Sequence, residues 1–306
     1  MCSSSCSIRS SARMSVQQQD AGAPRASLRL ARPGLSASGW VGAAIILVYV
    51  VVALTGAAWA PYGATAILTG SPFEGASLQH PFGTDNLGRD VFSRVVLGTR
   101  SVLTMTFAAT LLAVAVGGLI GIVFGYLRNW VDEIGMRIID ILISIPTLVL
   151  ALLIISAVGN SLWLVVLTVA FLFAPRVARV ARAATLTVVT NDYVAAALAR
   201  GESTLSICLR EILPNITGVM LVEFAIRCAF AIIFIGSLGF LGFGAPPPTP
   251  EWGLMINEAR ANATNSLWPV LAPATAMAVL VIGINLFADG LSRLIDRPGQ
   301  RSAEAK

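Results

Sequence analysis

The chain alternates long hydrophobic stretches with short polar ones. Four stretches contain no Asp, Glu, Lys or Arg, at residues 33–73, 101–127, 141–175 and 261–288. A helix needs roughly 20 mainly apolar residues to cross a bilayer, so each stretch holds at least one span. Together with the apolar segment that begins at residue 216, this pattern predicts six membrane-spanning helices. Their expected limits are about 40–60, 101–127, 138–158, 161–173, 216–240 and 267–288.

The composition supports this prediction and excludes a soluble enzyme. Hydrophobic residues make up 56% of the chain and charged residues only 12%, whereas soluble domains carry roughly 25% charged residues. Such a chain cannot cover a water-exposed surface with polar side chains, but in lipid its apolar side chains need no cover. The cysteines Cys2, Cys6, Cys208 and Cys228 lack metal-ligand spacing, so we expect free thiols and no metal site.

The arginines orient the chain in the membrane. Lys306 is the single lysine, so the net charge of +5 comes almost wholly from arginine. With the N-terminus in the cytoplasm, the arginine excess falls in the inner segments, as the positive-inside rule requires. We therefore expect an all-α integral membrane protein with six spans and both termini cytoplasmic. Residues 1–38 should form a disordered cytoplasmic tail, 39–297 the membrane domain and 298–306 a C-terminal tail.

The inner segment 176–215 contains a helix, a glycine and a second helix. Asn191 is a good N-cap for a helix over residues 193–200, and Gly201 suits the end of that helix. Ser203 can cap a second helix, which we expect to stop at Pro214. Such a module is either a connector that lies on the membrane surface or a docking site for a cytoplasmic partner. The residues alone favour neither interpretation.

This segment resembles the EAA loop of permease subunits in binding-protein-dependent ABC importers, which reads Glu-Ala-Ala, three residues, Gly, and then a stretch that ends near Leu-Pro. The chain departs from that pattern at Ala195, where the family usually has glutamate, and at Glu202, where a small residue is common. The positions that match in identity and spacing are Ala196, Ala197, Gly201, Leu213 and Pro214.

Two other segments narrow the resemblance. The outer stretch 80–94, HPFGTDNLGRDVFSR, is similar to the signature of the C-type permease subunit of the dipeptide, oligopeptide and nickel group. Residues 238–253, LGFLGFGAPPPTPEWG, resemble the turn after span five of that subunit, and Asp140 with residues 145–147 fits its third span. The resemblance covers about residues 40–297 and implies a fold like that of type I ABC importers.

The resemblance also implies a division of labour. The chain has no Gly-x-x-x-x-Gly-Lys-Ser/Thr phosphate loop, so we expect a non-catalytic subunit with no cofactor of its own. Two cytoplasmic ATPase subunits would bind ATP and Mg²⁺, a second homologous permease would complete the path, and an extracytoplasmic binding protein would deliver the substrate. The residues expected to couple to the ATPases are Ala196, Ala197, Arg200, Gly201, Glu202, Leu205, Leu209, Arg210, Leu213 and Pro214.

The implied protein is a multi-pass permease of the prokaryotic inner membrane. Di- or oligopeptides are the first expectation for its cargo, with nickel, glutathione or another small solute as the alternative. An ion-coupled secondary transporter would need midplane carboxylates or broken half-helices, and a membrane-embedded hydrolase would need a constellation of His or acidic residues. Neither rival explains the cytoplasmic helix-glycine-helix module.

Two groups of charged residues have two interpretations each. The outer residues Asp85, Arg89, Asp90 and Arg94 either contact the binding protein or the partner permease, or form an ion-pair network that holds their own loop. Glu223 and Arg227 are four residues apart on one helix face. They either line the translocation path or neutralise each other near the cytoplasmic end of span five.

Three aromatic side chains are expected at the surface. His80, the only histidine, lies in a loop and should be a surface residue rather than a metal ligand. Trp252 lies before the last predicted span and Trp268 at its start, and tryptophan often anchors a helix at the membrane interface.

Overall fold

The computed structural model describes residues 35–303, with the backbone alone for residues 296–303. Within this range the regular structure is helical, apart from one isolated β-bridge between Thr84 and Asp90. The expected N-terminal tail lies largely outside the described residues, and helix α1 begins at Ala37. The last helix, α10, continues to Ala303, so its end falls within the segment 298–306 that the sequence assigned to a C-terminal tail.

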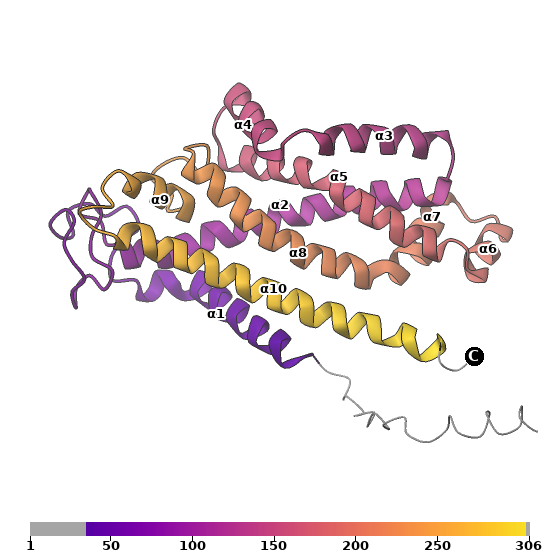
Figure 1. The fold of residues 1–306 in the computed structure, drawn as a ribbon, viewed down its shortest axis with the longest axis horizontal. Coiled ribbons are helices and arrows are strands. Elements are labelled where there is room, and N and C mark those ends of the chain that lie inside the picture. The colour runs from indigo at the N-terminus through magenta and orange to yellow at the C-terminus, as the bar shows by residue number, and fades with distance from the viewer. Residues whose placement is uncertain (1–34, 304–306) are drawn as a thin grey trace, which may run out of the picture. The chain divides into compact units, whose positions relative to one another are not determined.

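Long helices lie side by side along most of their length, and short helices cap both ends (Figure 1). Among the described residues, five segments are long and apolar enough to cross a membrane, and the bent pair of α3 and α4, taken as one span, gives the six spans that the sequence predicted. The helices are α1 Ala37–Trp59, α2 Val91–Leu127, α3 Trp130–Ser144, α4 Thr147–Val158, α5 Leu162–Val188, α6 Asp192–Ala199, α7 Thr204–Ser206, the π-helix η1 Ile207–Ile212, α8 Leu213–Phe240, α9 Trp252–Arg260 and α10 Trp268–Ala303.

The third span is broken. The sequence predicted one helix over about 138–158, but α3 and α4 meet at an angle of 87°. Ile145 between them is extended, with φ −79° and ψ 133°, because the ring of Pro146 disfavours helical backbone in the residue before it. Helix α3 also begins at Trp130, eight residues earlier than expected, with Asn129 as its N-cap.

The fourth span is longer than predicted because Pro175 lies inside α5 rather than after it. Proline removes one backbone hydrogen bond, but neighbouring helices can stabilise such a site in a membrane bundle. Pro175 is buried. As a result Arg176, Arg179 and Arg182 belong to α5 and not to a cytoplasmic loop, and α5 extends to Val188.

The closest packing in the bundle joins α2 to α5. Gly117, Gly121 and Gly125 recur every four residues on the face of α2 that meets α5. A Cβ atom on Gly121 would lie 2.2 Å from the carbonyl oxygen of Ala178, so only glycine permits this approach. Small residues at such spacing let two membrane helices pack backbone to backbone, which compensates for the absence of a hydrophobic drive within lipid.

The proline-rich segment after α8 contains a helix that the sequence did not predict. Helix α9 begins at Trp252, which is fully buried and donates a hydrogen bond from Nε1 to the carbonyl oxygen of Val95 at 3.1 Å. Trp252 is therefore a core residue, contrary to the expected interface anchor. Trp268 is 44% exposed and stacks on Phe82, which fits the interface position expected for it.

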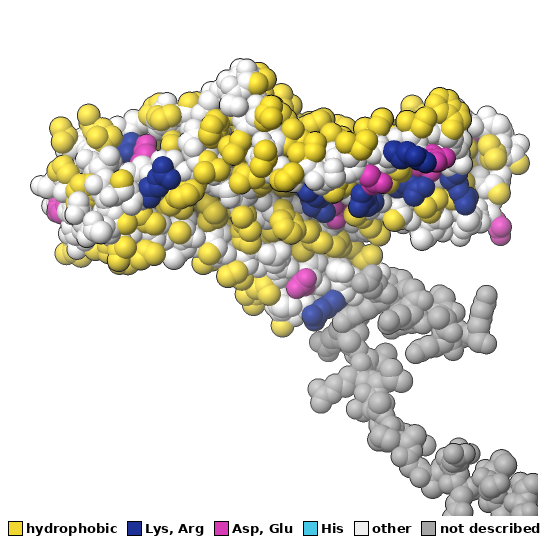
Figure 2. All heavy atoms as spheres, turned by 45° about the horizontal axis from the view of Figure 1, so that its top comes forward, with side chains coloured by type: hydrophobic (Ala, Val, Ile, Leu, Met, Phe, Trp, Pro, Cys, Tyr) yellow, Lys and Arg dark blue, Asp and Glu magenta, His cyan; other side chains and the backbone are white. Residues whose placement is uncertain are grey.

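The lateral surface of the bundle is hydrophobic. In Figure 2 hydrophobic side chains (yellow) cover much of the visible face, and charged side chains lie near the left end and over the right half. The exposed hydrophobic residues include Leu54 on α1, Phe107 on α2 and Ile282 on α10. A surface of this kind suits lipid or another membrane helix and not water.

Candidate functional site

The predicted helix-glycine-helix module extends from the same end of the bundle as the start of α3 (Figure 1). Helix α6 ends at Ala199, and Gly201 follows with φ +77°, a conformation that favours glycine. Ser203 then caps the next helical segment by accepting a hydrogen bond from the backbone N–H of Ser206 at 3.3 Å. The first helix, the glycine corner and the start of the second helix are where the sequence placed them.

One face of the module is fixed in the protein core. Val194 and Ala197 of α6 are buried against Ile207, Cys208 and Ile212 of the π-helix η1. The same cluster includes Val177 and Ala181 of α5, so α6 is anchored to the membrane bundle. Ala197 therefore holds α6 in place and does not present a docking surface, and Leu213 packs on the same cluster.

The opposite face is exposed and carries apolar side chains. Leu205 is 61% exposed, although a side chain of this kind is normally buried in a soluble module of this size. Tyr193 and Leu198 are also exposed on α6, at 37% and 60%, and were not selected from the sequence. Their spacing of four residues from Ala197 and Val194 gave no sign of this exposure, because residues four apart share a helix face. The exposed residues of the module are Tyr193, Ala196, Leu198, Arg200, Gly201, Leu205, Leu209, Arg210 and Pro214. Glu202 is half-buried.

Charged side chains border this apolar face. Arg200 Nη2 donates to Glu202 Oε1 at 2.7 Å, and Ser206 Oγ donates to Glu202 Oε2 at 3.1 Å. The hydrogen bond from Arg200, aided by the one from Ser206, lowers the pKa of Glu202 from its ordinary value. Glu202 is thus paired inside the module, at the position where the resembling family often has a small residue.

Pro214 does not end the second helix. The segment Thr204–Phe240 runs as one long helix through Pro214, contrary to the prediction. The π-helical turn of η1 precedes the proline, and Pro214 stands in the first turn of α8, where a missing N–H is tolerated. The helix-glycine-helix module is therefore continuous with the fifth span.

At the other end of the bundle, the outer acidic and basic residues form a buried ion-pair network. Asp85 Oδ2 accepts from Arg89 Nε at 2.6 Å and from Arg94 Nη1 at 2.7 Å. Glu258 of α9 pairs with the same two arginines, at 2.6 Å from Arg89 Nη2 and 3.0 Å from Arg94 Nη2. Asp85, Arg89 and Arg94 are each less than a tenth exposed. The network interpretation of these residues fits this arrangement.

His80 and Asp90 form a second buried group. His80 is 1% exposed, contrary to the predicted surface position. Its Nδ1 lies 3.0 Å from Asp90 Oδ1, and its ring stacks on Tyr62. Asp90 Oδ2 also accepts from the backbone N–H of Ser93 at 2.7 Å and so caps α2. Sequence reasoning missed this role because the partners lie in three different segments.

Glu223 and Arg227 pair within α8, with Arg227 Nε donating to Glu223 Oε1 at 2.6 Å. Glu223 is 6% exposed. Arg227 lies halfway between Leu213 and Phe240, so the pair is in the middle of α8 and not near its cytoplasmic end. Arg227 also lines a groove of about 340 Å³ between α4, α5 and α8, together with Arg176.

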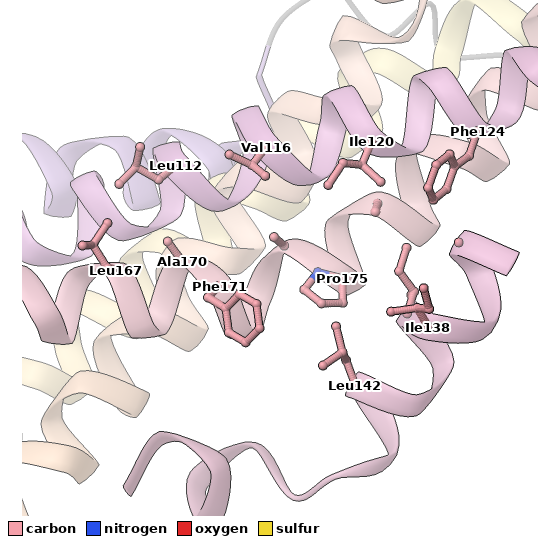
Figure 3. A pocket seen from close by; sticks show the side chains of 14 residues that line it. Leu112, Val116, Ile120, Phe124, Ile138, Leu142, Leu167, Ala170, Phe171 and Pro175 are labelled. Carbon is pink, nitrogen blue, oxygen red and sulfur yellow. The ribbon is translucent and has the colours of Figure 1, made fainter. Parts of the chain in front are cut away.

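A second groove, between α2, α3 and α5, is apolar. Its volume is about 490 Å³, and Leu112, Ile120, Ile138, Leu142 and Phe171 point into it (Figure 3). No charged side chain of the described residues lines it. A polar solute gains no hydrogen bond there, so this groove suits a lipid chain or a hydrophobic helix, and the groove beside Arg227 is the better candidate for a polar path.

The bundle of six apolar spans, broken once and joined by a cytoplasmic helix-glycine-helix module, defines a multi-pass membrane permease. Residues 117–298 match the family described as the binding-protein-dependent transport system inner membrane component. The chain belongs to this family, the permease subunits of ABC importers, and within it to the peptide, nickel and glutathione group. It is accordingly a non-catalytic subunit in the inner membrane of a bacterium.

Named relatives support this assignment. The chain is 38% identical over 256 residues to the glutathione transport system permease protein GsiD of Escherichia coli O1:K1, covering 83% of this chain and 84% of the relative. The protein of the same name from Shigella boydii serotype 4 gives the same identity and coverage. That of Pectobacterium atrosepticum is 38% identical over 223 residues, 73% of this chain and 74% of its own length.

Proposed function

We propose that this chain forms half of the translocation path of an ATP-driven importer for glutathione or short peptides. A second, homologous permease provides the other half. Two cytoplasmic ATPase subunits, which hold ATP and Mg²⁺, dock on the exposed face of the module around α6 and Gly201. An extracytoplasmic binding protein delivers the cargo at the end formed by α9 and the buried ion-pair network.

The exposed apolar face of the module carries the proposal for the ATPases. Leu205 and Leu209 project from a segment that the core cluster around Ala197 and Ile207 holds rigid. Because η1 continues into α8, closure of the ATPase pair displaces the fifth span. This span borders the groove between α4, α5 and α8 that Arg176 and Arg227 line. The displacement of the fifth span is the movement by which the ATPases switch the permease between its inward- and outward-facing states.

The cargo proposal rests on similarity. The relatives at 38% identity are named for glutathione transport, and glutathione is itself a small peptide-like molecule. The outer residues Asp85, Arg89 and Arg94 support delivery indirectly, because their ion pairs with Glu258 hold the outer loop and α9 as one surface for the binding protein or the partner permease. Asp90 contributes by holding His80 and the start of α2 in the same loop.

Co-purification from mild detergent tests the docking site. The substitution Leu205→Asp places a charge in the proposed apolar contact and should reduce recovery of the ATPases by about tenfold or more, since hot-spot contacts are worth about 2 kcal/mol or more. Leu78→Asp is the matched control, because Leu78 is fully exposed in the outer loop. Equal loss of the ATPases in both variants, or in neither, would contradict the docking site.

Uptake into proteoliposomes tests the cargo. The complete importer with its own binding protein should accumulate glutathione or a short peptide only when ATP is enclosed with the ATPases. Uptake of Ni²⁺ with no uptake of either peptide would move the chain to the nickel alternative. Uptake without ATP would contradict the importer mechanism itself.

A further inference from the structure

The groove between α4, α5 and α8 has charged side chains at positions well inside membrane-spanning helices. Its lining includes Thr147 and Leu148 from α4, Arg176 from α5, and Arg227, Phe230 and Ser237 from α8. Arg227 is at the midpoint of α8. An intramembrane charge is costly and usually faces a bundle interior or a polar path, so two arginines at one groove require an explanation.

The groove carries more positive than negative charge. Arg227 pairs with Glu223 through Nε alone, which leaves its two Nη amino groups without a hydrogen bond to any described residue. Arg176 donates from Nη1 to the carbonyl oxygen of Leu172 at 3.2 Å and from Nη2 to Thr147 Oγ1 at 2.8 Å. Within residues 35–295, no acidic side chain forms an ion pair with Arg176. Among the described residues, Arg176 is therefore a cation of the groove without a counter-ion.

The break in the third span adds to this positive character. Helix α4 starts beside Arg176, and Pro146 at its N-cap provides no side-chain hydrogen bond to the first N–H groups. The N-terminus of a helix carries partial positive charge, and broken membrane helices in transporters direct such ends at anionic groups of the substrate. The uncompensated Arg176 and this helix end favour an anion in the same place.

We infer that Arg176 and Arg227, with Thr147 at the start of α4, form a transient site for a carboxylate of the cargo during its passage. This inference rests on the proposed uptake of glutathione or short peptides, which carry carboxylates that are ionised at neutral pH. The guanidinium groups bind the carboxylate, and the exposed ring of Phe230 borders the apolar part of the cargo. Glu223 keeps the site from binding too tightly by neutralising one of the two arginines, since a path must also release what it binds.

Thiol modification tests the charge of the groove without any transport. Ser237→Cys is made in the full complex, in a chain whose native cysteines are replaced by Ser or Ala. Its thiol should react about tenfold faster with sulfonatoethyl methanethiosulfonate than with the cationic trimethylammonioethyl reagent, after correction for their intrinsic rates. Adding Arg176→Gln should remove most of this preference. Absence of any reaction, or no preference for the anion, would overturn the inference.

Transport tests the role of the same arginine. Arg176→Gln should lower ATP-driven uptake of glutathione or of a dipeptide about tenfold, and Arg176→Lys should lower it less. Arg179→Gln is the matched control on α5, because Arg179 pairs with Asp140 and does not line the groove. Co-purification of the ATPases with each variant verifies assembly. Wild-type uptake by Arg176→Gln would overturn the inference.

The two experiments separate this inference from the proposed function. If the wild-type importer carries a solute without a carboxylate and neither glutathione nor a peptide, the proposed cargo is wrong, whatever the thiol reactivity shows. If the importer carries glutathione and Arg176→Gln has no effect, the proposed cargo stands and the carboxylate site is wrong.

Discussion

Arg89 Nη2 lies 2.6 Å from Glu258 Oε2, and this ion pair joins the loop before α2 to the helix α9 that precedes the last span. Arg94 pairs with the same carboxylate oxygen at 3.0 Å, and Asp85 lies on the other side of both arginines. The outer surface of the permease is therefore fixed by two acids and two arginines from distant parts of the chain. Loss of one acid leaves the two buried arginines with a single counter-ion.

Asp85→Asn should destabilise the protein by roughly 3 kcal/mol or more, because removal of one partner leaves two buried arginines short of a counter-ion. The measurement is thermal unfolding of the purified chain in detergent. Glu133→Gln is the matched control, since Glu133 pairs with Arg137 at the same four-residue spacing but both side chains are more than two-thirds exposed. The control should change stability by less than about 1 kcal/mol. Equal effects would mean that the outer network is dispensable.

Gly121→Ala should loosen the contact between α2 and α5. The added methyl group would meet the carbonyl oxygen of Ala178 at 2.2 Å, and overpacking of this kind costs about 1–3 kcal/mol. Gly118→Ala on the same helix is the control, because its methyl group meets only the flexible end of Met220. Unfolding in detergent should show a lower Tm for the first variant alone. A Tm unchanged from wild type would show that the two helices can separate freely.

Gly201→Ala should strain the corner of the helix-glycine-helix module that we propose as the docking site for the ATPases. A non-glycine residue at φ +77° costs about 1 kcal/mol, and the exposed position offers no steric obstacle that would add to this cost. We expect faster amide hydrogen exchange in α6 and weaker stimulation of the ATPases by the loaded binding protein. Gly75 lies in open space and has no positive φ. Gly75→Ala is therefore the control and should leave the hydrogen exchange and the ATPase stimulation unchanged. Unaltered exchange in α6 of the Gly201 variant would contradict the role of the corner.

The stability of the outer end should depend on pH through Glu251. Burial raises the pKa of this carboxyl from 4.5 to about 7, although the backbone N–H groups of Gly253 and Leu254 oppose the shift. The folded protein thus retains a proton that the unfolded chain loses above pH 4.5. Stability is greatest below that pH and falls as pH rises through about 7.

Glu251→Gln removes this titration and serves as the test. Glu251 accepts from Gly253 N and Leu254 N through separate oxygens, both at 2.8 Å, so the amide loses one of these bonds at every pH. The variant should have a lower Tm at pH 5 but a smaller decrease in Tm between pH 5 and pH 8. A wild-type Tm that rises over this interval would contradict the assignment to Glu251.

The sequence alone predicted the features that depend on neighbouring residues. Apolar runs of sufficient length specify membrane helices wherever they occur, and six spans followed from them. Gly201 and Ser203 specified the corner and the second helix of the helix-glycine-helix module, because caps and left-handed corners act over a few residues. Asn191 stands at the N-cap position of α6 as predicted, although its side chain makes no capping hydrogen bond. The arginine distribution gave the orientation for the same reason, since it depends on composition and not on contacts.

Only the tertiary structure decided the features that depend on distant partners. Pro175 and Pro214 lie inside helices because the bundle and a π-helical turn compensate for their missing N–H groups, whereas a local rule ends a helix at each. Trp252 and His80 became core residues because Val95, Asp90 and Tyr62 lie beside them in space. Likewise, Arg176 and Arg227 share a groove only because α5 and α8 pack with α4 between their ends, a contact that no pattern within one segment encodes.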